Sequence, residues 1–308
     1  TIIISINHGF SSPPTPPTNN STVSRVAYLV SGSKGELDEL WWALRALCHP
    51  RNWYIVQFDL ESPVEERLEL SSNVANDPIF AKFGNVHVIS KANMLTYGGP
   101  MMVANTLHVC TILLKMSKEW DWFINLSASD YPLVTQDGML YTFSSLPRNL
   151  NFVEDTRKLE WKEYIDRSAW MMLSREFTEF CIWGWNKLLM TLIITIVNHN
   201  LHHITWDNLL KQHSHNLSAD DGPKMIAAKV PFARKFKYDD AFLLDRIDAE
   251  LLQRSNEGFV PGGWCSGSPP CSEVGDSSLL KPGQGAETLG KLMDKIVHSE
   301  VFTKHQCK

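Results

Sequence analysis

The sequence predicts an α/β protein built on a doubly wound, mostly parallel sheet with helices on both faces. From Arg25 onward, short apolar runs alternate with segments of helical periodicity, the pattern of strand–helix–strand units. The strand-like runs end on small or polar residues. The chain has 308 residues, 44% of them hydrophobic, which is enough for one large domain with a sizeable core.

The first half of the chain shows this alternation most clearly. Continuous apolar runs predict five strands, at 25–32, 53–58, 85–90, 122–126 and 150–155. Apolar residues at helical spacing predict helices over 36–48, 63–74 and 101–116. The second of these helices has Pro63 in its first turn, where a missing N–H costs nothing.

The second half is less regular. Apolar runs predict strands at 168–174 and 201–206. Helices are expected at 175–185, at 239–252 and, as an amphipathic terminal helix, at 286–302. The segment "PFARKF" (231–236) is expected to be a basic loop. No internal repeat is visible, so one compact unit is the economical interpretation.

The N-terminal residues 1–24 differ from the rest in composition. They begin with "TIIISI" and continue as "SSPPTPPTNNST". An apolar fragment before a Pro/Ser/Thr-rich stretch predicts the end of a membrane anchor and its stem, although a frayed terminus explains the same residues. The longest apolar run, at 188–197, has about half of the roughly 20 residues that a membrane span needs.

Charge and cysteine usage exclude some classes of function. The net charge is −5 with a pI near 6.1, and no dense Lys/Arg run occurs, which argues against a nucleic-acid partner. The six cysteines form no CxxC pair, so a structural zinc site is not expected. Cys265 and Cys271 bracket "SGSPP" and could close a disulfide or stay as free thiols.

N-glycosylation sequons occur at three places in the chain, and at the first of them Asn19-Asn20-Ser21 overlaps Asn20-Ser21-Thr22. Asn20 and Asn216 lie in polar segments and are plausible acceptors, whereas Asn125 lies within an apolar strand and is expected to be a chance match.

Polar residues follow several of the predicted strands. Because ligands bind beyond the carboxyl ends of parallel strands, these residues should meet at one edge of the sheet and form a cleft for a nucleotide or another polar ligand. The residues concerned are Ser31 and Gly32, Asp59, Tyr97, Ser127 to Asp130, and Glu154.

Two short motifs near this edge carry weak signals. "SGSKG" (31–35) lacks the full spacing of a phosphate loop and is better explained as a tight strand-to-helix turn. Asp59 and Glu61 imitate a DxD-like metal site, but a carboxylate on the second strand more often binds a ribose or base. We therefore favour donor binding by Asp59.

Two histidines and a basic pair in the second half are candidates for metal and phosphate binding. His202 and His203 lie in an extended segment, so they should point to opposite faces, and metal binding is the minority interpretation. Arg234 and Lys235 lie between aromatic residues. They could form an ordinary solvated turn, or they could neutralise a diphosphate leaving group in place of a metal ion.

Long segments of the chain resemble the core-2/I-branching glycosyltransferase family, most closely its plant branch of β-glucuronosyltransferases acting on arabinogalactan. The resemblance runs from about Arg25 to "QC" (306–307). The segments that carry it include "HPRNWYIVQFDLESP", "FGNVHVISKANMLTYGGP", "DWFINLSASDYPL", "CIWGW", "PFARKF" and "PGGWC".

The resemblance implies a GT-A-like fold over 25–308 and an inverting, metal-independent transfer from a UDP-sugar to a galactan acceptor, with no cofactor. It implies a nucleotide-sugar-binding half at 25–155 and an acceptor- and diphosphate-binding half at 156–308. It also implies a single-pass type II protein of the Golgi membrane with a lumenal catalytic domain.

The family's site residues carry over by position. Asp59 and Tyr97 would contact the UDP, and Ser127 with Asp130 would line the donor-sugar pocket. Glu154 would bind the acceptor sugar. Lys235, together with Arg234, would hold the diphosphate.

The catalytic base is the point at which this sequence departs from the family. The family's base lies in a Ser-Pro-Glu-like context between the "CIWGW" helix and the "LHHITW" strand, but no acidic residue occurs here between Glu179 and Asp207. A second shortening is predicted near "EYIDRSAW". Asp130, Glu154 or Asp207 could substitute, and nothing in the sequence selects one, so the catalytic residue is left unknown.

Two functions from different classes therefore stay open. One is a glycosyltransferase, and the other is a UDP-sugar-binding relative or defective isoform that lacks the base. A nicotinamide-dependent enzyme is a remote third hypothesis, because the glycine fingerprint of such enzymes is absent.

Overall fold

We analysed a computed structural model of the chain. The structure describes residues 23–89, 100–153, 170–184, 195–197, 199–206, 214–237, 241–253, 263–274 and 276–298. The predicted stem at 1–24 lies almost entirely outside these ranges. No helix in them combines the length and hydrophobicity that crossing a membrane requires.

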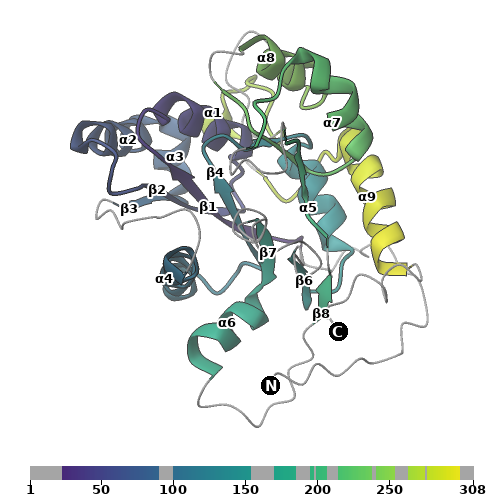
Figure 1. Ribbon diagram of the computed structural model, residues 1–308, viewed down its shortest axis with the longest axis horizontal. Coiled ribbons are helices and arrows are strands. Elements are labelled where there is room, and N and C mark those ends of the chain that lie inside the picture. The colour runs from purple at the N-terminus through teal and green to yellow at the C-terminus, as the bar shows by residue number, and fades with distance from the viewer. Residues whose placement is uncertain are drawn as a thin grey trace.

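A seven-stranded sheet forms the centre of the molecule (Figure 1). In spatial order its strands are β3 (Val86–Ile89), β2 (Trp53–Phe58), β1 (Val26–Gly32), β4 (Trp122–Ser127), β7 (Met171–Ser174), β6 (Leu150–Val153) and β8 (Thr195–Val197). β1 pairs in parallel with β2 and β4, and β7 runs antiparallel between β4 and β6. The 3-2-1-4 order of the parallel half is that of nucleotide-binding α/β sheets.

Helices cover both faces of this sheet (Figure 1). On one face lie α1 (Leu37–Leu47), α2 (Val64–Asn76), α3 (Pro78–Phe83), α5 (Gln136–Ser144) and α9 (Gly283–His298). On the other face lie α4 (Pro100–Met116) and α6 (Arg175–Trp183). Alternate residues of β1 enter the two cores, with Tyr28 on the first face and Leu29 on the second. The predicted doubly wound α/β class, with a mostly parallel sheet between two layers of helices, is confirmed.

A second, three-stranded sheet lies beside the large one. It is formed by β5 (Tyr131–Pro132), β10 (Phe232–Arg234) and β9 (His202–Ile204), and α1, α7 (Gly222–Ala228) and α8 (Ala241–Glu250) pack against it. The prediction of a basic loop at 231–236 is wrong, because Phe232 to Arg234 form the central strand of this sheet. Partners about 30 and 100 residues away supply the hydrogen bonds, and a local pattern cannot show them.

Five further elements were absent from the sequence-based prediction: α3, β5, α5, β8 and α7. α5 shows the reason most clearly. Its first two residues, Gln136 and Asp137, are polar yet fully buried, so the helix has no polar outer face to mark its period.

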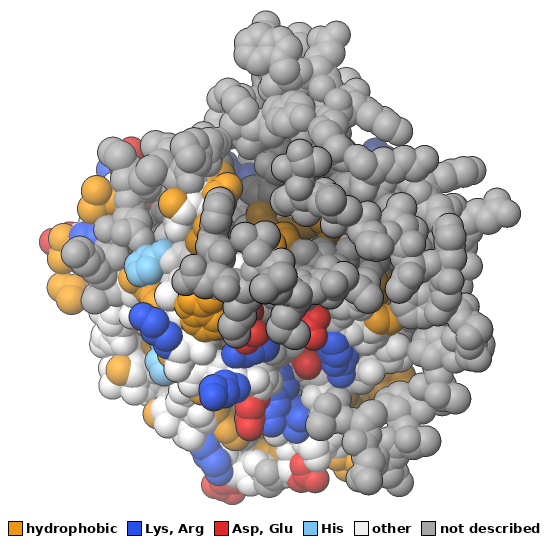
Figure 2. All heavy atoms as spheres, turned by 90° about the horizontal axis from the view of Figure 1, so that it is seen from below, with side chains coloured by type: hydrophobic (Ala, Val, Ile, Leu, Met, Phe, Trp, Pro, Cys, Tyr) orange, Lys and Arg blue, Asp and Glu red, His pale blue; other side chains and the backbone are white. Residues whose placement is uncertain are grey.

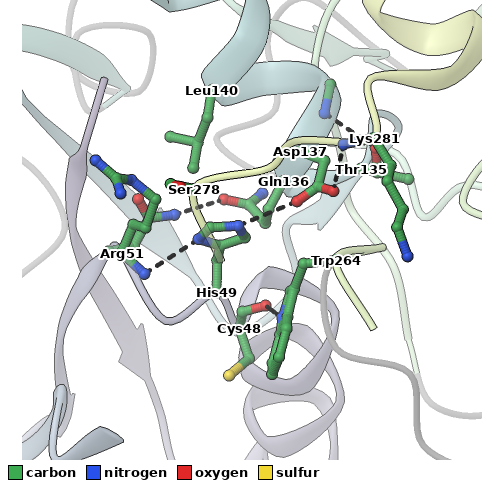
Figure 3. Close-up of polar contacts among 12 residues, drawn as sticks. Cys48, His49, Arg51, Thr135, Gln136, Asp137, Leu140, Trp264, Ser278 and Lys281 are labelled. Carbon is green, nitrogen blue, oxygen red and sulfur yellow. Dashed lines mark hydrogen bonds and ion pairs between the residues drawn. The ribbon is translucent and has the colours of Figure 1, made fainter. Parts of the chain in front are cut away.

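A buried polar network explains why these α5 side chains can lie in the core (Figure 3). The Arg51 N–H donates to His49 Nδ1, so the His49 ring is protonated on Nε2, which donates to Asp137 Oδ1 at 3.0 Å. The other carboxylate oxygen of Asp137 accepts the Lys281 N–H at 2.7 Å. Trp264 packs edge-on against His49 and donates its indole N–H to the Cys48 carbonyl. The network thus fastens the C-terminal segment to the sheet.

Cys265 and Cys271 form a disulfide, which decides between the two alternatives left open by the sequence. Among the described cysteines, Cys48, Cys110 and Cys181 are free thiols.

Candidate active site

A cleft opens at the carboxyl ends of β1, β2 and β4, the edge that the sequence predicted. Its wall is formed by β1, β4, α4 and β10, together with the residue after β2 and the residue before β7. It is lined by Leu29, Ser31, Gly32, Ser33, Asp59, Met102, Asn105, Thr106, Asn125, Leu126, Ser127, Trp170 and Arg234. Among the predicted site residues, Asp59, Ser127 and Arg234 therefore meet in one place.

The turn between β1 and α1 is held by carboxylates. The Ser33 N–H donates to Glu36 Oε2 at 2.9 Å, and the Gly35 N–H lies 3.1 Å from both carboxylate oxygens of Glu66. These amides are already paired, so this turn is not a phosphate cradle. The interpretation of "SGSKG" as a tight strand-to-helix turn is confirmed.

Gly32, at the end of β1, is packed too closely for any side chain. A Cβ there would lie 2.6 Å from Phe58 Cε1 and 2.9 Å from Leu40 Cδ1. We expect Gly32→Ala to lower the free energy of unfolding by about 1–3 kcal/mol through overpacking. Urea denaturation would measure this, with Gly290→Ala as the control, because a Cβ at Gly290 meets no atom within 4 Å. Equal midpoints for the two variants would contradict the packing argument.

Asp59 lies on the wall of the cleft just after β2. Its Oδ1 accepts both the backbone N–H of Ser62, at 2.9 Å, and the Ser62 hydroxyl, at 2.8 Å. These bonds fix the carboxylate and leave Oδ2 without a hydrogen bond to any described residue. Glu61, the other half of the DxD-like pair, is exposed and does not line the cleft. The geometry favours a ligand contact by Asp59 over a paired metal site.

Asp130 lies beneath the cleft rather than on its wall. The carboxylate is 1% exposed, and its Oδ2 accepts the Ser127 N–H at 2.6 Å and the Trp170 indole N–H at 3.2 Å. Its Oδ1 lies 3.5 Å from Arg234 Nε, within ion-pair distance but without hydrogen-bond geometry. Asp130 therefore orients the residues that line the cleft.

Arg234 is the cation that the described part of the cleft wall contains. Its guanidinium lies 4.1 Å from the centroid of the Trp170 ring, and the residue is 5% exposed. Only its Nε is buried without a hydrogen bond, so the terminal nitrogens are the ones that can reach a ligand from the wall. Lys235 is half-buried and does not line the cleft.

Sequence reasoning missed several residues of the site. The Trp170 ring packs against the Arg234 guanidinium, and its indole N–H donates a hydrogen bond to Asp130. In the sequence, however, Trp170 looks like any aromatic residue of a strand. Met102, Asn105 and Thr106 face the cleft from α4 at spacings of three and four residues. That spacing was available in the sequence, but only the pairing of α4 with the sheet shows which face of the helix meets the cleft.

Some predicted residues are not part of this geometry. Tyr97, Glu154 and Asn20 lie outside the described residues. Asn216 is exposed, as a glycosylation acceptor must be. Asn125 lines the cleft, and its Oδ1 accepts the Met171 N–H, so it is engaged inside the fold.

His202 and His203 do point to opposite faces of β9. His202 is buried behind the cleft, whereas His203 is half-buried and interacts electrostatically with Asp221 and Lys224. No cluster of three or more His, Cys, Asp or Glu side chains that could hold a metal occurs among the described residues.

The buried histidines predict acid sensitivity. Burial lowers the pKa of His49 and lowers that of His202 to about 4, whereas both titrate near 6.5 when unfolded. The unfolded state therefore binds more protons, so stability is greatest above about pH 6.5 and falls as the pH drops toward the folded-state values. We expect the urea midpoint to decrease steadily from about pH 7 to about pH 4.5. A constant midpoint across this window would contradict the assignment.

The described residues on the face drawn in Figure 2 form no polyanion-binding patch. Lys and Arg side chains lie interspersed with Asp and Glu side chains there. Several described arginines are paired with carboxylates, as in Arg25–Glu119 and Arg148–Asp121.

Comparison with known proteins identifies the family. The model of the Core-2/I-Branching enzyme family matches residues 26–168. β-Glucuronosyltransferase GlcAT14B of Arabidopsis thaliana is 44% identical over 92% of this chain and 80% of its own length. The chain belongs to the Core-2/I-branching enzyme family. This Core-2/I-branching enzyme is also similar to β-glucuronosyltransferases GlcAT14A and GlcAT14C of the same plant. GlcAT14A is 42% identical over 97% of this chain and 79% of its own length, and GlcAT14C is 37% identical over 94% and 86%.

These relatives establish that this Core-2/I-branching enzyme is a glycosyltransferase. The alignment with GlcAT14B also contains a difference in length. It spans 349 positions, at least 41 more than the 308 residues of this chain, so the relative has residues without a counterpart here.

Proposed function

We propose that this glycosyltransferase transfers glucuronate from UDP-glucuronate to galactan side chains of arabinogalactan proteins. The observation that carries the proposal is the cleft, in which Asp59, Ser127 and Arg234 meet at the carboxyl ends of parallel strands. Three relatives named β-glucuronosyltransferases, at 37–44% identity, support the donor sugar. Tyr97 and Glu154 stay as predicted contacts to the UDP and to the acceptor.

The chemistry follows from the charges on the wall of the cleft. As the sugar leaves, negative charge develops on the diphosphate, and a fixed cation stabilises it more than it stabilises the bound donor. The terminal nitrogens of Arg234 are placed for this role, with Lys235 as the predicted second cation. We propose that the pair performs the function of a divalent metal and that the transfer inverts the anomeric centre.

A general base must take the proton of the acceptor hydroxyl in such a transfer. Neither described aspartate at the cleft is assigned this task, because Asp130 is buried beneath the cleft and Asp59 is the proposed contact to the UDP. Without a base, turnover should fall by roughly 10²–10⁴-fold. The second candidate function is therefore a UDP-sugar-binding relative with little turnover, and the absence of acidic residues between Glu179 and Asp207 favours it.

One pair of measurements separates these candidates. UDP binding is measured by calorimetry with and without a chelator, and transfer of labelled glucuronate is measured on a β-galactan oligosaccharide, with UDP-galactose as the control donor. Binding and turnover that both resist the chelator support the metal-independent transferase. Binding without turnover supports the second candidate, and an absence of UDP binding would overturn both.

The cellular setting is part of the proposal. We propose a type II protein of the Golgi membrane, with the domain in the lumen and an N-glycan on the exposed Asn216. The disulfide between Cys265 and Cys271 fits an oxidising compartment. Digestion of the secreted domain with an N-glycosidase should reduce its mass, and Asn216→Gln should remove part of that reduction.

A further inference from the structure

Two polar side chains near the cleft, His202 and Arg234, lie on the same face of the three-stranded sheet. Phe232 of β10 is in register with His202 of the parallel strand β9 and with Pro132 of the antiparallel strand β5. Registered residues share a face, and so do residues two apart on one strand. Arg234 therefore lies on the face that carries His202.

His202 contacts Trp170, the residue whose ring lies against the Arg234 guanidinium. Its imidazole stacks on Phe232, with ring centroids 5.0 Å apart and planes 22° apart. The His202 ring also contacts the Trp170 ring, with centroids 6.1 Å apart. The Arg234 guanidinium carbon lies over the Trp170 ring, 4.1 Å from its centroid. The contacts thus run from Phe232 through His202 and Trp170 to Arg234.

Packing alone does not explain why position 202 is a histidine. Both ring nitrogens of His202 are buried without a hydrogen-bond partner among the described residues. Asp130 Oδ1 and Arg234 Nε are likewise buried without a hydrogen-bond partner among the described residues. The charges of both groups affect the pKa of His202. A phenylalanine would fill this space without leaving polar atoms unpaired, and such unpaired atoms are costly in a native structure.

The neutral state of His202 suits this environment. Burial lowers its pKa, and although the Asp130 carboxylate opposes this shift, the Arg234 guanidinium adds to it. A neutral imidazole offers one N–H donor and one acceptor nitrogen. Through one buried water it can therefore bond to either partner, without competing with Arg234 for the charge of Asp130.

We propose that His202 is a positioning residue for Arg234. Its ring supports Trp170, and its nitrogens complete the buried polar cluster with Asp130 Oδ1 and Arg234 Nε. The guanidinium is thereby fixed so that its terminal nitrogens face the diphosphate. The inference rests on the proposed role of Arg234 in binding UDP.

The test compares UDP with uridine, because only UDP carries the groups that Arg234 would bind. His202→Phe keeps an aromatic ring and removes both nitrogens. We expect it to weaken UDP binding about tenfold, the effect of losing one hydrogen bond to a charged group, and to leave uridine binding unchanged. The matched control is His203→Phe, the next residue on β9 and on its opposite face, which should change neither affinity.

A second comparison covers the case in which His202→Phe does not fold. His202→Gln and His202→Met introduce side chains of similar length that differ in polarity. We expect Gln to retain most of the preference for UDP over uridine and Met to lose it. Equal UDP affinities for Gln and Met, or a His202→Phe protein that binds UDP like the unmodified enzyme, would overturn the proposal.

Measurements on Arg234→Ala distinguish a failure of the proposed donor-binding role of Arg234 from a failure of the positioning role of His202. If Arg234→Ala leaves the preference for UDP over uridine intact, the proposed donor-binding role of Arg234 is wrong, and the role of His202 falls with it. If Arg234→Ala removes the preference and the His202 variants keep it, only the positioning role is wrong.

Discussion

Arg234→Ala should weaken UDP binding by about 100-fold, since two charge-assisted hydrogen bonds of its terminal nitrogens would be lost. Uridine, which has no phosphate, should bind as before. Transfer activity should fall at least as far, because the leaving diphosphate carries more charge in the transition state than in the bound donor. Calorimetry with both ligands measures the effect.

The Arg234→Ala substitution also changes the surroundings of the Asp130 carboxylate. Removing Arg234 leaves a carboxylate that is 1% exposed without its cationic neighbour, and its charge would also repel the diphosphate. The double variant Asp130→Asn with Arg234→Ala removes this repulsion. If the double variant regains full UDP affinity, Arg234 acts only by neutralising Asp130 and not by binding the diphosphate.

Two further variants separate charge from geometry. Arg234→Lys keeps the positive charge but loses the planar fork, so we expect an intermediate loss of affinity. Lys235→Ala should cost less than Arg234→Ala, because Lys235 does not line the described cleft. A larger loss for Lys235→Ala would make Lys235 the principal cation, as the family resemblance implies.

Asp137→Ala should lower the free energy of unfolding by about 3–5 kcal/mol, because two buried donors would lose their acceptor. The donors are the His49 imidazole N–H and the Lys281 backbone N–H, and both His49 and Asp137 are fully buried (Figure 3). Chemical denaturation at about pH 7.5, where His49 is neutral in both states, measures the loss.

Two controls isolate the buried bonds from the helix-terminus effect. Asp38 also lies in the first turn of a helix, α1, but is exposed, so Asp38→Ala should cost less than about 1 kcal/mol. Asp137→Asn keeps one acceptor oxygen and should lose about half of the stability that Asp137→Ala loses. If Asp38→Ala and Asp137→Ala had equal effects, the network would not hold the C-terminal segment in place.

Much of the site's frame was predictable from the sequence. A strand that ends on "SASD" and a strand that ends on Asp59 belong to the same parallel sheet, so their tips had to share an edge. Ser127 and Asp59 accordingly line one cleft. Asp130 was harder to place, because the turn after β4 folds its carboxylate back onto the Ser127 amide and away from the wall.

Of the three strands in the second sheet, only β9 was predicted from local patterns, and the pairing of the three strands could not be. β10 is three residues long, and its hydrogen bonds go to β5 and β9, which are distant in sequence. Short strands of this kind have too few residues to show a period. The position of Arg234 in the cleft therefore depends on pairings that only the folded chain reveals.

By itself, the sequence determined the α/β class, the order of its main strands and helices, and the family, because these depend on local periodicity and on long ordered motifs. The tertiary structure decided which polar groups face the cleft and which support it from behind. Trp170, His202 and Arg234 meet through contacts between strands 30 or more residues apart, and the burial that keeps His202 neutral comes from residues on several elements. Burial and orientation of a side chain are properties of the surrounding fold, and so no reading of neighbouring residues could supply them.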